Sequence, residues 1–214
     1  MLVCVLGEVC DVLFPPTLAQ SLNRGHRRLK YFDPPESQPF RQLGWTDVNI
    51  PDAQQLARTA VVEGIVLLKN DGTLPLTKHV TKIALVGPWG NATTAMQGNF
   101  FGVAPFLISP FQGAQEARFE VESVLGTSTT TNDTSGFAAA VEAAARADVV
   151  VFAGGLDESV EAEQLDRLTV TWPGNQLDLI QQLASVGKPL VVVQFGGGQV
   201  DDSALNANTG VRRA

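Results

Sequence analysis

The stretch VVVFAGG at residues 149–155 decides the fold, because the apolar run 149–153 leads directly into a pair of glycines. Two similar apolar runs, IALV at 83–86 and LVVVQF at 190–195, lie before and after it in the chain. Runs of Val, Ile and Leu without polar alternation are typical of strands that are buried on both faces of a parallel sheet. A weaker run at 119–125 alternates apolar with acidic residues, which predicts an edge strand.

Helical patterns separate these predicted strands. Residues 135–147 are rich in Ala, and residues 175–186 repeat Leu and Ile at the spacing of one helix face. Alternation of strands and helices predicts an α/β fold, a doubly wound and mostly parallel sheet that forms an α/β sandwich. Farther upstream, Pro51 suits a first helical turn, and a helical apolar pattern follows it until the turn residues 70–72.

The sequence divides into three parts by pattern. Residues 1–50 carry scattered prolines, and we expect there an irregular N-terminal segment and connector, a remnant of the end of another domain. Residues 51–78 are predicted to be a linker helix and turn. Residues 79–214 are predicted to be the sandwich domain, cut short at its C-terminus.

Composition excludes several classes of protein. Of the 214 residues, 44% are hydrophobic and 17% are charged, as in ordinary globular domains, and the formal net charge is −7. An acidic chain argues against a nucleic-acid partner, and no apolar stretch has the length of a membrane span. Glu8 and Asp11 interrupt the N-terminal apolar run, so we expect no signal peptide. Cys4 and Cys10 lack histidine partners, and we expect neither a metal site nor a cofactor.

In parallel α/β sheets, sites form in the loops after the strands. The loop after the first strand, GPWGN at 87–91, contains Trp89, which is a candidate for stacking on a sugar ring. A packing role for Trp89 fits equally well. The loop after the last strand, GGGQVD at 196–201, allows close approach of a ligand or is a simple tight turn.

The loop after 149–153 carries five carboxylates between residues 157 and 166, answered by Arg167. Repulsion among clustered carboxylates favours their protonated form, which a general acid requires. A solvated acidic loop is the plain alternative, and a calcium loop would need a spacing that is missing. Asp166 directly precedes Arg167, and we expect it to pair with neighbouring groups in a structural role. The usual serine-nucleophile motif is absent.

Six motifs in this order resemble fungal β-xylosidases of glycoside hydrolase family 3, over about residues 31–208. They are EGIVLLKNDGTLPL (63–76), IALVGPWGNAT (83–93), QGNFFGVAPFLISP (97–110), EAEQLDR (161–167), WPGNQLDLI (172–180) and GGGQVD (196–201).

The resemblance implies a retaining glycosidase, in which a (β/α)8-type barrel supplies an aspartate nucleophile and the sandwich domain lends the acid/base. It implies Glu161 as the acid/base, Glu163 as the close alternative, and Asp157 and Trp89 beside the substrate. In an extended loop Glu161 and Glu163 would share one face, so spacing leaves the choice between them open. Since no nucleophile motif of the barrel is present, we expect the barrel to be missing from this chain and the chain alone to be inactive.

The implied substrate is a xylo-oligosaccharide, and the implied location is extracellular. Two N-glycosylation motifs, at Asn91 and Asn132, agree with a secreted glycoprotein. Two other interpretations compete with the enzyme. One is a non-catalytic module that binds a carbohydrate or a protein. The other is a flavodoxin-like nucleotide binder, which the absence of a phosphate-binding loop disfavours.

Overall fold

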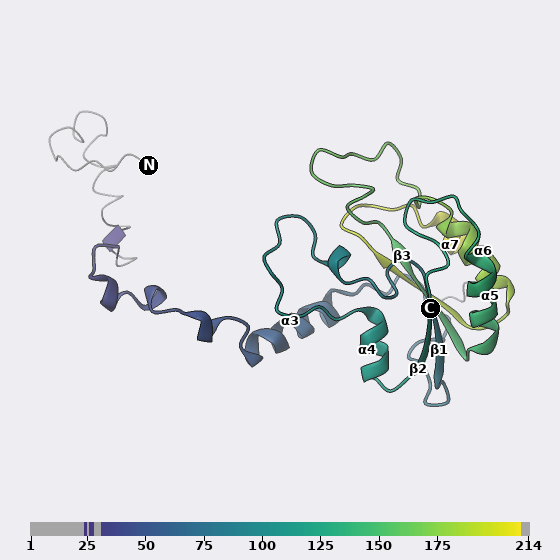
Figure 1. Ribbon diagram of the computed structural model, residues 1–214, viewed down its shortest axis with the longest axis horizontal. Helices are drawn as coiled ribbons and strands as arrows, with labels where there is room; N and C mark the ends of the chain where they lie inside the picture. The colour runs from purple at the N-terminus through teal and green to yellow at the C-terminus, as the bar shows by residue number, and fades with distance from the viewer. Residues whose placement is uncertain (1–23, 25, 28–30, 211–214) are drawn as a thin grey trace. The chain divides into compact units, whose positions relative to one another are not determined.

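The computed structural model describes residue 24, residues 26–27 and residues 31–210 of the chain (Figure 1). The chain divides into two compact units, Met1–Val66 and Leu67–Ala214. Cys4, Cys10 and the apolar run at the N-terminus lie outside the described residues.

The described part of the first unit contains short helical elements and one longer helix. Three 3-10 helices, η1 (Pro35–Ser37), η2 (Pro39–Arg41) and η3 (Trp45–Asp47), precede helix α3 (Pro51–Gly64). The start of α3 at Pro51 confirms the sequence-based expectation. Its end at Gly64 is earlier than the predicted stop at 70–72. Glycine is the poorest helix former after proline, and the β-branched pair Ile65 and Val66 follows it, so propensity explains the earlier end.

The second unit is built on four parallel strands: β1 (Lys82–Val86), β2 (Glu120–Val124), β3 (Val149–Gly155) and β4 (Leu190–Phe195). Their order across the sheet is β2-β1-β3-β4. Every pairing is parallel, and the two most buried strands, β1 and β3, lie in the centre. The alternating run at 119–125 forms an edge strand, as its pattern predicts.

Helices cover both faces of this sheet (Figure 1). Helices α5 (Phe137–Arg146) and α6 (Gln176–Ser185) lie on one face and contact each other. Helix α4 (Pro110–Glu116) packs on the other face, beside β2. A fourth short helix, α7 (Ser203–Ala207), follows β4. The doubly wound α/β architecture is therefore confirmed. Among the described residues, no helix has the length and apolarity needed to cross a membrane.

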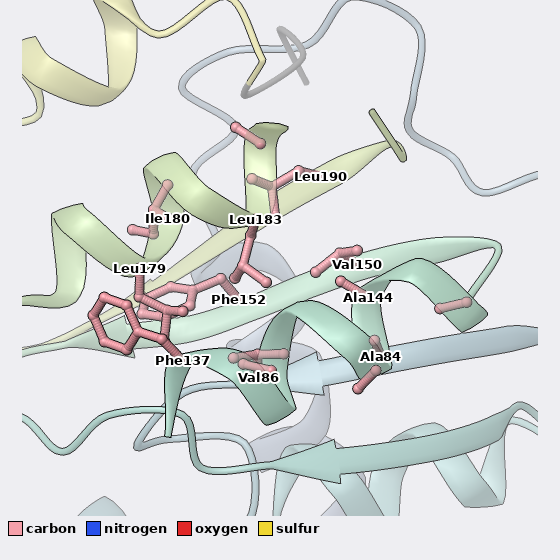
Figure 2. Packing of buried hydrophobic residues seen from close by; sticks show 14 of the residues in the cluster. Ala84, Val86, Phe137, Ala144, Val150, Phe152, Leu179, Ile180, Leu183 and Leu190 are labelled. Atoms are coloured by element: carbon pink, nitrogen blue, oxygen red, sulfur yellow. The ribbon is translucent and has the colours of Figure 1, made fainter. Parts of the chain in front are cut away.

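Two apolar clusters, one on each face, hold the sheet to its helices. The larger cluster joins the inward faces of α5 and α6 to alternate residues of β1, β3 and β4 (Figure 2). Its largest fully buried side chains are Phe152, Leu179, Ile180, Leu183 and Leu190. The second cluster lies under α4 and includes Ile83, Leu85, Trp89 and Val191. Burial on both faces explains why β1 and β3 lack polar alternation. The run 190–195 forms the other edge strand, β4, and its second half is largely exposed, so the prediction that it is buried on both faces is wrong there.

Candidate active site

The loops that leave β1, β3 and β4 start from one edge of the sheet, because parallel strands end on the same side. The β1 loop begins with Gly87 in the left-handed region, at a φ of +113°. A Cβ at this position would lie 2.3 Å from the carbonyl oxygen of Ala153, so only glycine fits. The backbone N–H of Trp89 donates to that same carbonyl at 3.0 Å, and this bond joins the β1 loop to β3.

Trp89 itself is directed into the domain. Its side chain is buried, and its ring stacks on Phe195 with centroids 4.8 Å apart and an interplanar angle of 7°. Its Nε1 is buried and donates to no described residue. Trp89 therefore packs on the end of β4, and its role in stacking on a sugar stays a prediction.

Asp157 anchors the acidic loop. One carboxylate oxygen accepts from the backbone N–H of Ser159 at 2.9 Å and from the Ser159 hydroxyl, and the other accepts from the Thr129 hydroxyl. Both oxygens are thus occupied by groups of the protein itself. These bonds hold the loop after β3 to the loop after β2.

Glu161 forms an ion pair with Arg167. The Arg167 Nε donates to the Glu161 Oε2 at 2.6 Å, and the Arg167 side chain is only 10% exposed, against 40% for Glu161. The sequence predicts instead that Asp166 pairs with neighbouring groups in a structural role. Asp166 is exposed, and among the described residues no ion pair or hydrogen bond involves it, so that prediction is wrong.

Glu163 lies at the tip of a tight turn. The backbone N–H groups of Ala162 and Leu165 donate to each other's carbonyls at 3.0 and 2.9 Å, and Gln164 between them has a φ of +67°. The loop is therefore folded back on itself, so the shared face expected for Glu161 and Glu163 in an extended loop does not exist. Glu163 is exposed, and within the described part of the chain its carboxylate has no hydrogen bond or ion pair.

A buried polar network supports this loop from below. Gln176, at the start of α6, is fully buried and donates from Nε2 to the carbonyls of Thr129, Gly155 and Pro173. Asn175 beside it accepts from the Thr127 hydroxyl. The helical pattern at 175–186 includes Gln176 but does not indicate this role. The one sequence feature that could have indicated it is the position of this Gln at the start of a helix, just after the Trp-Pro-Gly turn.

The surface near the β1 loop contains a hollow of about 300 Å³, lined by Gly87, Pro88, Asn91, Ala92, Ser123 and Leu125. None of the four candidate residues lines it. Across the described ranges, no group of three or more His, Cys, Asp or Glu side chains is arranged to hold a metal ion.

Comparison with known proteins gives a consistent family match. Residues 65–211 match the profile described as the glycosyl hydrolase family 3 C-terminal domain. The chain is 55% identical over 198 residues to a probable exo-1,4-beta-xylosidase, bxlB, of Aspergillus terreus. This alignment covers 91% of the chain and 26% of the relative. The chain thus spans about a quarter of the length of the curated relatives it matches.

Solved structures agree with the fold. A GH3 exo-beta-xylosidase (XlnD) in complex with a xylobiose aziridine activity-based probe has a TM-score of 0.79 and 54% identity, over 82% of this chain and 23% of that one. A beta-glucosidase from Listeria innocua in complex with glucose has a TM-score of 0.70 and 32% identity, over 78% of this chain and 23% of that one.

Proposed function

The chain belongs to the glycosyl hydrolase family 3 C-terminal domain family, and from this premise we propose that it is the acid/base domain of an exo-acting β-xylosidase. The similarity to exo-1,4-β-xylosidases, at 54–55% identity, supports xylose-terminated oligosaccharides as the substrate class. In the reaction, a protonated carboxyl group donates its proton to the departing glycosidic oxygen while a second carboxylate attacks the sugar.

We assign the acid/base role to Glu163. The observation that carries this assignment is the tight turn at Ala162–Leu165, which exposes the Glu163 carboxyl group and leaves it without a bond to the described protein. A proton donor has to reach the glycosidic oxygen of a substrate, and Glu163 is free to do so. Glu161, which the sequence favoured, is held by Arg167 at 2.6 Å.

The second carboxylate of this reaction is proposed to come from a (β/α)8-type barrel domain outside these 214 residues. The chain aligns with only about a quarter of the length of its relatives, and this supports the presence of a further domain in the whole enzyme. Without a nucleophile no glycosyl-enzyme intermediate forms. The 214-residue chain alone is therefore expected to give no turnover of an aryl β-xyloside.

A chimera tests the proposal. This chain replaces the matching segment of the exo-β-xylosidase XlnD, and hydrolysis of xylobiose and of a dinitrophenyl β-xyloside is measured. Glu163→Gln is expected to lower kcat on xylobiose by about 10²–10⁴, the usual contribution of general acid–base catalysis. The kcat/KM on the dinitrophenyl substrate, which reports the formation of the glycosyl-enzyme intermediate, should fall far less, because that leaving group departs without a proton.

The matched control is Glu158→Gln, which removes another exposed carboxylate of the same loop. It should leave both rates unchanged. If Glu163→Gln keeps its turnover of xylobiose, and Glu161→Gln loses turnover of xylobiose but little on the dinitrophenyl substrate, the acid/base is Glu161 instead. An inactive chimera, together with xylobiose binding by the 214-residue chain alone, would support the non-catalytic binding module.

The extracellular location is also a proposal. Asn132 and Asn91 both begin N-glycosylation motifs and are exposed, but the Asn91 Oδ1 accepts a hydrogen bond from the buried Ser109 hydroxyl at 2.9 Å. Asn132 is therefore the favoured site of a glycan. Expression with a secretion signal in a fungal host should give a mass shift that endoglycosidase treatment and Asn132→Gln both remove.

A further inference from the structure

Glu161 and Arg167 close the base of the hairpin whose tip carries Glu163. The two residues flank the bridge between Ala162 and Leu165, and their side chains meet through the 2.6 Å bond from Nε to Oε2. The pair therefore fixes where the two arms of the hairpin start.

Arg167 also reaches a second loop. Its Nη2 donates to the carbonyl oxygen of Gln199, in the loop after β4, at 2.6 Å. Because the guanidinium is a rigid planar group, its two bonds, one to Glu161 and one to the Gln199 carbonyl, fix the distance between the two loops. One more backbone bond, from the Asp201 N–H to the Val170 carbonyl at 2.7 Å, joins the same two segments.

Gly198 leaves the space that this arrangement needs. A Cβ at Gly198 would lie 2.3 Å from the Glu161 Oε2 and 2.8 Å from the Arg167 Nη2. Any side chain at this position would therefore displace the Glu161 carboxylate and the Arg167 guanidinium from these positions. This steric requirement is independent of the charges and gives a second way to disturb the pair.

Burial separates this ion pair from the other charged pairs of the domain. Arg167 is 10% exposed, whereas Lys82, which pairs with Glu120, is 28% exposed and its partner 71%. Exposed pairs contribute little, but removing one partner of a buried charge leaves the other uncompensated. The Arg167 Nη1 is buried and has no described partner, so Glu161 and the Gln199 carbonyl are the acceptors that the guanidinium has here.

We propose that Glu161 and Arg167 are positioning residues, a clamp that holds the hairpin tip and hence the Glu163 carboxyl group in place. Gly198 is the third member of this clamp, through the space it leaves. The inference rests on the proposed acid/base role of Glu163 and assigns a separate task to the other glutamate of the EAE motif.

The first test uses the 214-residue chain and backbone amide hydrogen exchange measured by mass spectrometry. Arg167→Met, Glu161→Gln and Gly198→Ala are compared with the unchanged chain and with Glu158→Gln. Exchange in segments 161–167 and 196–201 is expected to rise about tenfold in the three clamp variants, as local opening becomes easier. The double variant Glu161→Gln/Arg167→Met should exchange no faster than the faster single variant, because both remove one interaction.

The second test uses the XlnD chimera and the same variants. Misplacing the proton donor is expected to lower kcat on xylobiose about ten- to a hundredfold, with KM nearly unchanged. The kcat/KM on the dinitrophenyl β-xyloside should stay within about twofold, because the departure of dinitrophenolate in the first step needs little proton donation. General damage to the domain would lower both rates by the same factor.

Each outcome has a defined meaning. Unchanged exchange in Arg167→Met overturns the clamp, and equal losses on both substrates overturn its positioning role. If Glu163→Gln by itself leaves xylobiose turnover intact, the proposed acid/base role fails and the positioning of Glu163 fails with it. Faster exchange in that case would still show the clamp as a structural contact.

Discussion

Gln176 and Gly155 exchange two hydrogen bonds through one side chain. The Gly155 N–H donates to the Gln176 Oε1 at 2.9 Å, and the Gln176 Nε2 donates to the Gly155 carbonyl at 2.9 Å. The amide thereby mimics one more strand at the end of β3, where the sheet has stopped and the acidic loop begins. Backbone groups at this buried position would otherwise have no partner.

Replacing Gln176 with Leu should therefore destabilise the domain strongly. Leu keeps the volume but leaves buried donors and acceptors unpaired at Gly155 and Thr129, and each such group costs about 1–3 kcal/mol. We expect a loss of about 3 kcal/mol in the free energy of unfolding, measured by urea denaturation. Gln182→Leu, on the exposed face of α6, is the control and should change little. Equal losses in the two variants would contradict the network.

Gly87→Ala tests the close approach between the β1 loop and β3. The added Cβ would meet the Ala153 carbonyl at 2.3 Å, in a backbone conformation with a φ of +113° that disfavours any side chain. Both effects act together, so we expect a loss of about 2–4 kcal/mol in thermal unfolding experiments. Gly102→Ala meets no atom within 4 Å and should be neutral. A neutral Gly87→Ala would show that the two strand ends can separate freely.

The sheet could be predicted well from local pattern, because the composition of a strand reflects which of its faces are buried. The run VVVFA became β3 with both faces covered, and the acidic alternation at 119–125 became the edge strand β2. Helix α4 was missed for the opposite reason. Its sequence, PFQGAQE, contains a glycine and lacks a clear apolar face, and tertiary contacts define it: Ser109 caps it, and the Phe111 N–H donates to the Gly90 carbonyl at 2.9 Å.

The acidic loop was also found from sequence, but its internal assignment was not. The sequence favoured a structural role for Asp166 through pairing with neighbouring groups, whereas the hairpin gives such a pairing to Glu161, which meets the Arg167 guanidinium. Spacing treated Glu161 and Glu163 as equivalent, since it assumed an extended loop. The tight turn at Gln164, with a φ of +67°, removes that equivalence. The sequence EAEQLDR gives no indication of this turn.

Acid should reveal the contribution of Asp148. Its Oδ2 accepts from the N–H groups of Thr81 and Lys82, both at 2.9 Å, and from the Thr81 hydroxyl, which fixes the start of β1 beside β3. These backbone hydrogen bonds, the largest cause, hold the pKa of Asp148 below its ordinary value. A carboxyl group with a lowered pKa in the folded state stabilises that state above its unfolded pKa, and the stabilisation is lost as pH falls through the folded value.

We therefore expect the difference in Tm between the unchanged chain and Asp148→Ala to be constant from pH 7 to about pH 4. Below that it should shrink, because the unchanged chain then loses the ionised bond that Asp148→Ala already lacks. Asp166→Ala, which removes an exposed aspartate without a described partner, should show no such convergence. A difference that grows on acidification would mean that Asp148 contributes through its neutral form.

Lys69 joins the beginning of the second unit to helix α7. Its ammonium group donates to the carbonyl oxygens of Leu205, Asn206 and Asn208 at 3.1, 3.2 and 3.3 Å, at the C-terminal end of α7. A cation is also favoured at this end by the helix dipole.

Lys69→Met keeps the length of the side chain and removes both effects, so we expect a loss of about 1–2 kcal/mol in urea denaturation. Amide exchange in segment 203–208 should rise in the same variant. Lys78→Met, which removes an exposed lysine with no described hydrogen bond, is the matched control. If both lysine variants unfold at the same urea concentration, α7 is held by Leu205 packing into the core alone.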